Sequence, residues 1–290
     1  MKLLKRINFF AKFYRGSKRY FFSAIGFPSK IREDVSAVYN FCRLVDDSID
    51  EPFKSLHSFE EIVSEYKKAL KTDESSYPLI HEFVRIKKSK RIEDEWVEAL
   101  FKSMEMDRTN KIYEKLEDTL EYSYGVAEVI GLFMCRVLEL PIEGYQTAKY
   151  LGRSAQWINF IRDINEDLEM GRTYFPISDL KKFNLKNLNY ETVINQRDDF
   201  NNFMNLQFDR FEKWVKEGEK GYKFIPNKYK RPIQYATSLD KWKLGQIKMN
   251  PYIVYRKKVN PGIFELIIYL FKIYLPEKKL PRFILRENPV

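Results

Sequence analysis

Cysteine and histidine are nearly absent from this chain, with two of each among 290 residues. Two cysteines cannot form a disulfide framework, and so few Cys and His exclude the usual zinc sites. Any metal must therefore be held by carboxylates, which are the ligands that hard ions such as Mg²⁺ prefer.

Glycine and proline are also scarce, at 11 and 12 residues, against 23 Phe and 19 Tyr. An all-β chain of many short strands needs more turn residues than this. The hydrophobic content of 44% allows a large core and excludes global disorder. No repeat, low-complexity tract or Gly/Ser linker interrupts the sequence. We therefore expect one all-α domain over residues 1–290, built as a helical bundle.

No hydrophobic run is long enough to cross a membrane. The longest candidate, residues 263–275, spans 13 residues and contains Glu265 and Lys272, whereas a spanning helix needs about 20 apolar residues. Cations interrupt the apolar N-terminus, unlike a signal peptide. We expect no transmembrane segment and a cytoplasmic location. The net charge of +10 favours an anionic partner: nucleic acid, anionic lipid or a phosphorylated small molecule.

Apolar residues recur three or four positions apart along most of the chain, which predicts helices. Their ends are marked by Pro52, a Ser58–Glu61 capping box, Pro141 and Gly171. The predicted helices cover residues 31–50, 58–71, 93–107, 113–140, 144–170, 198–218, 232–249 and 262–275. Residues 171–191 read as a loop.

The first predicted helix carries a row of polar side chains. Asp46 and Asp50 are four residues apart and so lie on one helical face, which continues back through Arg43 and Tyr39. Like charges at this spacing destabilise a bare helix, and a bridging Mg²⁺ would remove that cost. A solvated acidic helix end would explain this first aspartate row, taken alone, equally well.

A second row lies on the helix predicted for residues 144–170. Asn159, Asp163 and Asp167 follow one another at intervals of four, with Gln156 one turn earlier. The other faces of this helix are apolar, with Trp157, Ile158, Phe160, Ile161 and Ile164. A polar row in so apolar a helix favours a cleft inside the bundle over bulk solvent.

Two carboxylate rows with cations nearby suit one chemistry in particular. Mg²⁺ ions held by carboxylates bind a diphosphate and neutralise the charge that develops as it leaves. The carbocation that remains needs an apolar, aromatic pocket that excludes water. The 46 aromatic residues of this chain can build one.

The motifs resemble those of squalene and phytoene synthases over about residues 15–260. Tyr39 to Asp50 looks like the first aspartate-rich motif of that family, and Asn159 to Asp167, running on to Pro176, is similar to the second. Met104–Asp107 and Tyr122–Gly131 match further stretches in the family's order. The resemblance implies an all-α fold of the class I isoprenoid synthase type with a central cavity, and Mg²⁺-dependent head-to-head joining of two prenyl diphosphates. Mn²⁺ is the alternative ion.

The resemblance also implies roles for individual residues, in which the acidic rows bind metal and basic or polar residues bind diphosphate. The implied metal ligands, catalytic through the metal, are Asp46, Asp50, Asn159, Asp163 and Asp167. Tyr122 corresponds to a tyrosine near the reacting carbons that acts as a proton shuttle; a buried tyrosine with a purely structural hydroxyl is the alternative. The implied substrate-binding residues are Ser17, Lys18, Arg19, Tyr39, Arg43, Gln156 and Lys257.

The product depends on the length of the substrate's prenyl chain and on the last step of the reaction. Ala24 stands where C30-forming relatives can carry a bulky aromatic residue, and Ser36, one turn before Tyr39, is likewise small. Small residues at these positions favour C20 substrates and phytoene. Close packing of these small residues against another helix is the alternative. Squalene formation would need NADPH, which the lack of a Gly-rich dinucleotide fingerprint disfavours. Two departures from the family pattern, Glu128 and Asp240, remove no metal ligand. The insoluble product favours a peripheral membrane contact on the inner face.

Three other classes of protein remain as alternatives. A non-catalytic relative that acts in protein assembly should have lost its aspartate rows. A nucleic-acid-binding protein should expose its aromatic residues along a basic groove, whereas here they fall on apolar helix faces. A chain elongase or cyclase would carry acidic motifs with different flanking residues.

Overall fold

The computed structural model describes residues 18–50, 55–109 and 112–275, and throughout these ranges the regular structure is helical, without strands. The all-α prediction is confirmed. The helices are α2 (Lys18–Ile25), α3 (Ser29–Asp50), α4 (Phe59–Thr72), α5 (Pro78–Lys90), α6 (Asp94–Arg108), α7 (Leu116–Ser123), α8 (Val129–Val137), α9 (Tyr145–Arg162), α10 (Ile164–Glu169), α11 (Ile177–Lys182), α12 (Tyr190–Asn195), α13 (Arg197–Glu219), α14 (Asn227–Met249) and α15 (Ile263–Tyr274). Single-turn elements join them: the π-helix η1 (Tyr124–Glu128) and the 3₁₀ turns η2 (Ile142–Gly144), η3 (Lys220–Phe224) and η4 (Pro251–Tyr255).

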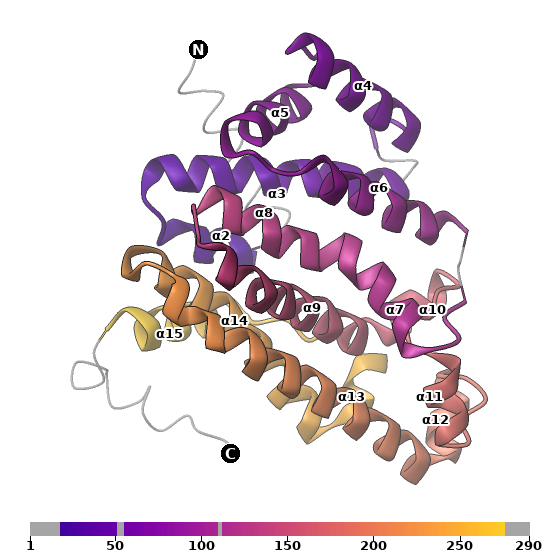
Figure 1. Cartoon of the computed structure of the whole chain (residues 1–290). Helices are drawn as coiled ribbons and strands as arrows, with labels where there is room; N and C mark the ends of the chain where they lie inside the picture. The colour runs from indigo at the N-terminus through magenta and orange to yellow at the C-terminus, as the bar shows by residue number, and fades with distance from the viewer. Residues whose placement is uncertain (1–17, 51–54, 110–111, 276–290) are drawn as a thin grey trace.

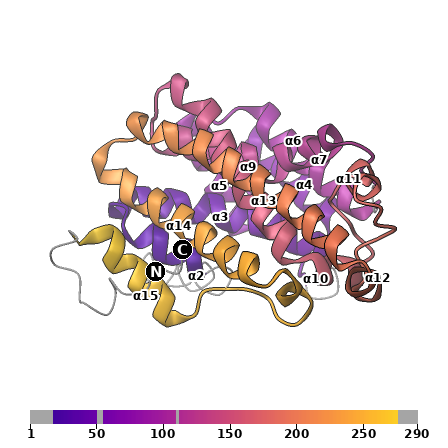
Figure 2. The same ribbon diagram turned by 90° about the horizontal axis from the view of Figure 1, so that it is seen from below.

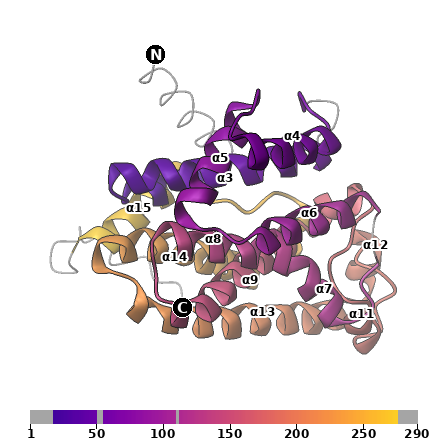
Figure 3. The ribbon, with the colours of Figure 1, turned by 45° about the horizontal axis from the view of Figure 1, so that its top comes forward.

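The long helices are stacked in layers. Figure 3 shows α4 and α5 above α3, then α8 and α9, with α13 on the opposite side of the molecule. α14 packs on α9 and also contacts α2 and α15, so the two ends of the described chain meet at one end of the bundle (Figure 2). The C-terminal ends of α3 and α6 lie at the other end, near α7 and α10 (Figure 1).

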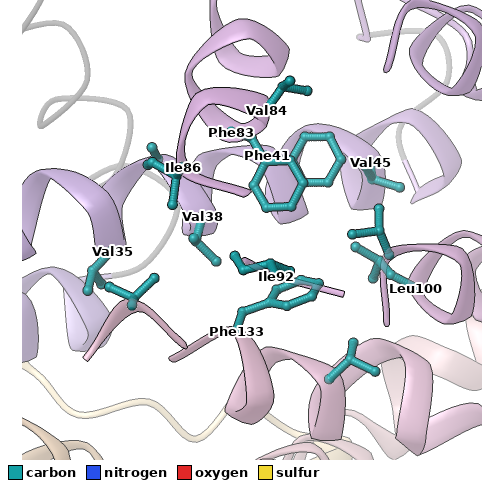
Figure 4. Packing of buried hydrophobic residues seen from close by; sticks show 14 of the residues in the cluster. Val35, Val38, Phe41, Val45, Phe83, Val84, Ile86, Ile92, Leu100 and Phe133 are labelled. Carbon is teal, nitrogen blue, oxygen red and sulfur yellow. The ribbon is translucent and has the colours of Figure 1, made fainter. Parts of the chain in front are cut away.

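One hydrophobic core lies between the first helices and α8. Phe41 of α3 stacks face to face on Phe83 of α5, with ring centroids 3.8 Å apart, and Phe133 of α8 closes the cluster (Figure 4). Burial of such aromatic and branched side chains is the main force that holds these helices together. This core fixes α3 against α6 and α8, and with it the orientation of the first aspartate row.

A second core surrounds α9. Trp157 is fully buried and meets Trp214 of α13 edge to face at 4.9 Å. All five apolar residues predicted to fill the faces of this helix are buried: Trp157, Ile158, Phe160, Ile161 and Ile164. The apolar periodicity of α9 therefore identified its core faces.

Several predicted helix ends are confirmed. Ser58 caps α4, and its hydroxyl accepts from the Glu61 amide while the Glu61 carboxylate accepts from the Ser58 amide. Gly171 follows α10 with a φ of 72°, a conformation that glycine adopts without strain. The predicted helix 31–50 corresponds to α3.

Other boundaries differ from the prediction. Residues 113–140 form α7, η1 and α8 rather than one helix, and residues 144–170 form α9 and α10 with a break at Asp163. The interval read as a loop contains α11, and α14 begins five residues before Pro232. The prediction lacked α2, α5 and α12. None of the described helices is both long enough and apolar enough to span a bilayer.

Candidate active site

The first aspartate row lies on the C-terminal half of α3. Arg43 donates to Asp46 over 2.7 Å and pairs with Asp47 at 2.6 Å. Burial, and then the charge of Asp50, raise the pKa of Asp46 to about 7, although Arg43 opposes the shift. The row predicted from the spacing thus exists, and a cation bound there would offset both the burial and the mutual repulsion of its carboxylates.

The second row bends at Asp163, between α9 and α10. The Asp163 amide donates to the Asn159 carbonyl and the Asp167 amide to the Asp163 carbonyl, each over 2.8 Å, so the i, i+4 spacing survives the break. Arg162 donates to Asp163 over 2.7 Å. Burial, and then Asp163 and Glu166, raise the pKa of Asp167 to about 8, against the opposing charge of Arg172.

Arg172 connects the two rows. Its Nη1 donates to Asp50 Oδ1 over 2.6 Å, and its backbone amide donates to the Asp167 carbonyl over 2.8 Å. Because Arg172 follows α10 directly, the segment that ends the second row also reaches the end of the first. The structure therefore brings both rows to one site.

A buried carboxylate lies beside them. Asp107, in the last turn of α6, accepts hydrogen bonds from the hydroxyls of Tyr122 at 2.6 Å and Tyr174 at 2.8 Å. Burial raises the pKa of Asp107, although both tyrosine hydroxyls oppose the shift. Tyr122, the predicted proton shuttle, thus has a carboxylate directly behind its hydroxyl.

A cavity of about 500 Å³ opens next to this cluster. It lies between the end of α3, the start of α4 and the segment that carries Arg172. Asp107 and Arg172 are on its wall, as are Ser48 and His57. Asp107 therefore lines this cavity while its carboxylate oxygens accept from the two tyrosines.

The donor set fits magnesium bound together with a diphosphate. Within the described ranges no three acidic, His or Cys side chains gather into a ready-made metal cluster. Each row instead offers two carboxylates, and Mg²⁺ is commonly held by one or two carboxylates with substrate phosphates as the remaining ligands. Asp46 and Asp167 are partly buried and surrounded by like charge, which a divalent cation would offset.

The remaining predicted binding residues are placed as follows. Tyr39 and Gln156 are half-buried, one turn before Arg43 and Asn159 respectively, and the Asn159 amide approaches the Gln156 Oε1 at 3.5 Å. Lys18 and Arg19 are the first residues of α2, and Ser17 lies outside the described residues. Lys257 is exposed after η4. Its neighbour Lys258 lies 3.6 Å from Asp163 and pairs with Glu166.

Four site residues were not singled out from the sequence: Asp107, Arg172, Tyr174 and Lys258. Asp107, Arg172 and Tyr174 belong to stretches that resemble the family's motifs. No spacing rule, however, predicts a contact between Asp107 and Tyr174, which are 67 residues apart. Glu128, the departure noted above, is 1% exposed and pairs with Arg153 at 2.6 Å. Asp240 is buried with Lys243, 3.2 Å away. Each departure thus pairs with a basic residue, and neither is a member of an aspartate row.

Comparisons with known proteins identify relatives of this chain in sequence and in fold. The squalene/phytoene synthase family profile matches residues 14–262. The 15-cis-phytoene synthase of Synechococcus elongatus is 25% identical over 264 residues, which cover 84% of each chain. The 4,4'-diapophytoene synthase of Staphylococcus haemolyticus is 31% identical over 179 residues, 60% of this chain and 62% of that one.

A crystal structure of a dehydrosqualene synthase superposes with a TM-score of 0.82 at 19% identity, covering 92% of this chain and 94% of the other. This likeness concerns the fold, whereas the family profile covers both aspartate rows, Asp107, Tyr122 and the Arg172–Tyr174 segment. The chain belongs to the squalene/phytoene synthase family and is a prenyltransferase of that type, which condenses two prenyl diphosphates head to head.

Proposed function

We propose that this enzyme converts two molecules of geranylgeranyl diphosphate into phytoene and diphosphate, in carotenoid biosynthesis. The observation that carries the C20 choice is the small size of Ala24 in α2 and Ser36 in α3, which are both buried. Small side chains along a substrate tunnel would leave room for longer prenyl chains. The phytoene synthases among the relatives support the same choice.

The proposed metal ligands are Asp46 and Asp50 for one diphosphate and Asn159, Asp163 and Asp167 for the other. Mg²⁺, with Mn²⁺ as the alternative, would supply charge neutralisation for the departing diphosphate. Arg43, Tyr39 and Gln156 extend the two rows by one turn and would contact diphosphate oxygens, as would Lys257 and the segment Ser17–Arg19. Charge-assisted hydrogen bonds from guanidinium groups are the strong ones in such a site.

In the first half-reaction one prenyl diphosphate ionises, and the double bond of the other attacks the allylic cation. Loss of a proton, which Tyr122 would accept as the proposed proton shuttle, gives a cyclopropyl prenyl diphosphate. This intermediate then ionises and rearranges, and a second proton loss gives phytoene. Buried aromatic rings such as Phe160 and Tyr174 exclude water beside the rows.

A second candidate is the C15 reaction, which yields dehydrosqualene, or squalene where NADPH is used. The diapophytoene synthase at 31% identity and the fold of the dehydrosqualene synthase favour it. The deciding experiment incubates the protein and Mg²⁺ with farnesyl or geranylgeranyl diphosphate, with and without NADPH, and measures the hydrocarbon by mass. A C40 product without NADPH supports the proposal, whereas C30 as the only product, with or without NADPH, rejects it.

The product also implies a partner, because a C40 hydrocarbon is insoluble in water. α15 exposes Ile263, Phe264, Ile267 and Phe271 along its length, in a chain whose net charge is +10. We propose that this face contacts an anionic lipid surface peripherally, on the inner face of the membrane. Co-sedimentation with anionic vesicles at low salt tests this, and loss of binding in an Ile267→Glu/Phe271→Glu variant is expected.

A further inference from the structure

The Asp107 carboxylate accepts hydrogen bonds from the hydroxyls of two tyrosines. Tyr122 Oη donates to its Oδ2 over 2.6 Å, and Tyr174 Oη donates to its Oδ1 over 2.8 Å. The three side chains are at most 7% exposed. With each hydroxyl hydrogen directed at the carboxylate, the phenol oxygens turn their lone pairs elsewhere and can act only as acceptors toward other groups.

The surrounding packing fixes this arrangement. The Tyr174 ring stacks on both Tyr122 and Phe160, with centroid separations of 4.9 and 4.6 Å, and those two rings lie 6.1 Å apart. Thr119 Oγ1 donates to the Tyr174 carbonyl over 2.8 Å, which ties the backbone of this segment to α7. Phe160 follows the proposed ligand Asn159 directly. The tyrosine pair is therefore held rigidly beside the second row.

Electrostatic coupling places Asp107 close to both rows. Its charge contributes to the raised pKa values of Asp46 and Asp167, and Asp50 and Arg172 act on Asp107 in turn. Burial raises the pKa of Tyr122 far above its usual value, so a standing tyrosinate is unfavourable. If Tyr122 accepts a proton, it must release its own in the same step.

We propose that Asp107 is a positioning residue that orients Tyr122 and Tyr174 and takes the Tyr122 hydroxyl proton when Tyr122 receives a proton from the substrate cation. The substrate C–H bond breaks, and its electron pair closes the cyclopropane ring. The released proton bonds to Tyr122 Oη as the former Oη–H proton moves to Asp107 Oδ2. The proton then leaves through the cavity that Asp107 lines. This inference rests on the proposed head-to-head reaction but not on substrate chain length.

The test compares Asp107→Asn, Tyr122→Phe and the double variant in steady-state assays with Mg²⁺ and whichever prenyl diphosphate the wild type uses. General-base steps contribute about 10²–10⁴-fold, so each single variant is expected to lose about 100-fold in kcat. KM is expected to stay within about threefold, because neither residue binds diphosphate. The double variant is expected to lose no more than the worse single one, since both residues serve one proton transfer.

Asp179→Asn is the matched control, because Asp179 is equally buried and is held by Arg210 at 2.9 Å in the second core. Its kcat is expected to stay close to that of the wild type. Wild-type kcat in Asp107→Asn, or losses that multiply in the double variant, overturns the inference while the proposed function stands. If Asp107→Asn does not fold, Tyr122→Phe provides the test, because a wild-type kcat in Tyr122→Phe also overturns the inference. A wild type that makes only C30 rejects only the proposed substrate, and one that makes no hydrocarbon from either substrate overturns both.

Discussion

Arg172 reaches across 122 residues of sequence to donate a hydrogen bond to Asp50 over 2.6 Å. The Arg172 side chain is 12% exposed and that of Asp50 33%, so the pair is partly shielded from water. Arg172 also lowers the pKa of Asp167 against the effects of burial and neighbouring carboxylates. One cation thus balances acidic groups in both rows.

Replacing Arg172 with Met should therefore destabilise the metal-free protein. The variant keeps the length of the side chain but leaves Asp50 and Asp167 without their shared cation, which costs about 1–3 kcal/mol for a partly buried charged hydrogen bond. Urea unfolding in the presence of a chelator measures the loss. Lys241→Met is the control, because its exposed pair with Glu219 should contribute less than about 1 kcal/mol. Equal losses in the two variants would contradict the linking role of Arg172.

The pH dependence of stability should report the acidic rows. The pKa of Asp167 is about 8 in the folded protein, against a usual value near 4. Between these values the folded state binds more protons than the unfolded state, so this group makes stability fall as pH rises from about 4 to 8. Asp163, Glu166, Asp107 and Arg172 are the charged groups that act on it.

Without metal, Asp167→Asn should accordingly be more stable than the wild type at pH 8. The gain is about 1.4 kcal/mol for each unit by which the pKa of Asp167 in the folded protein exceeds its value in the unfolded chain. The difference should vanish near pH 4, where the wild-type carboxyl is protonated. Melting temperatures in chelator across this range test the sign. Mg²⁺ should raise the wild-type melting temperature at pH 8 and change the Asp167→Asn variant less. A variant less stable than the metal-free wild type at pH 8 would refute this assignment.

Both aspartate rows could be read from the sequence because they depend on local geometry. A spacing of four residues defines a face of a helix whatever the helix packs against, and the apolar residues around Asp163 marked the buried faces. The contacts between rows could not be read in this way. Two hydrogen bonds, from Arg172 to Asp50 and from Tyr174 to Asp107, join segments that are far apart in the sequence. Whether these segments meet depends on how α3, α6 and α9 pack.

The break in the helix predicted for residues 113–140 has a tertiary cause of the same kind. At Gly125, within η1, a Cβ atom would lie 2.2 Å from the Ala99 carbonyl oxygen, so glycine lets this turn approach α6. The periodicity of apolar residues alone does not indicate that a π-helical turn interrupts the α-helix here. The helix end at Gly171, in contrast, is encoded by the residue itself.

Enlarging Ala24 should change the product if this residue limits chain length. Ala24→Phe adds a ring beside Phe27, which is expected to lower C40 synthesis about tenfold or more while C30 synthesis from farnesyl diphosphate persists. Overpacking costs about 1–3 kcal/mol, so melting temperature is measured alongside. Ala24→Gly, which adds no volume, should leave the product pattern unchanged. Parallel loss of both products in Ala24→Phe, with the fold intact, would assign Ala24 a packing role instead.

Glu128 should matter for stability rather than for metal binding. Its carboxylate is 1% exposed and is held by Arg153 at 2.6 Å, with Lys149 at 3.7 Å, which ties η1 to α9. Removing one partner of a buried ion pair costs about 3–5 kcal/mol, because the other charge remains buried. Glu128→Gln should therefore lower the free energy of unfolding by that amount. Glu139→Gln, which breaks the pair of an exposed glutamate with Lys90, should lower the free energy of unfolding by less than about 1 kcal/mol.

Because the Glu128–Arg153 ion pair lies outside both aspartate rows, the Mg²⁺ concentration that gives half-maximal activity should be the same in Glu128→Gln as in the wild type. A shift in that concentration without a loss of stability would place Glu128 in the metal site instead.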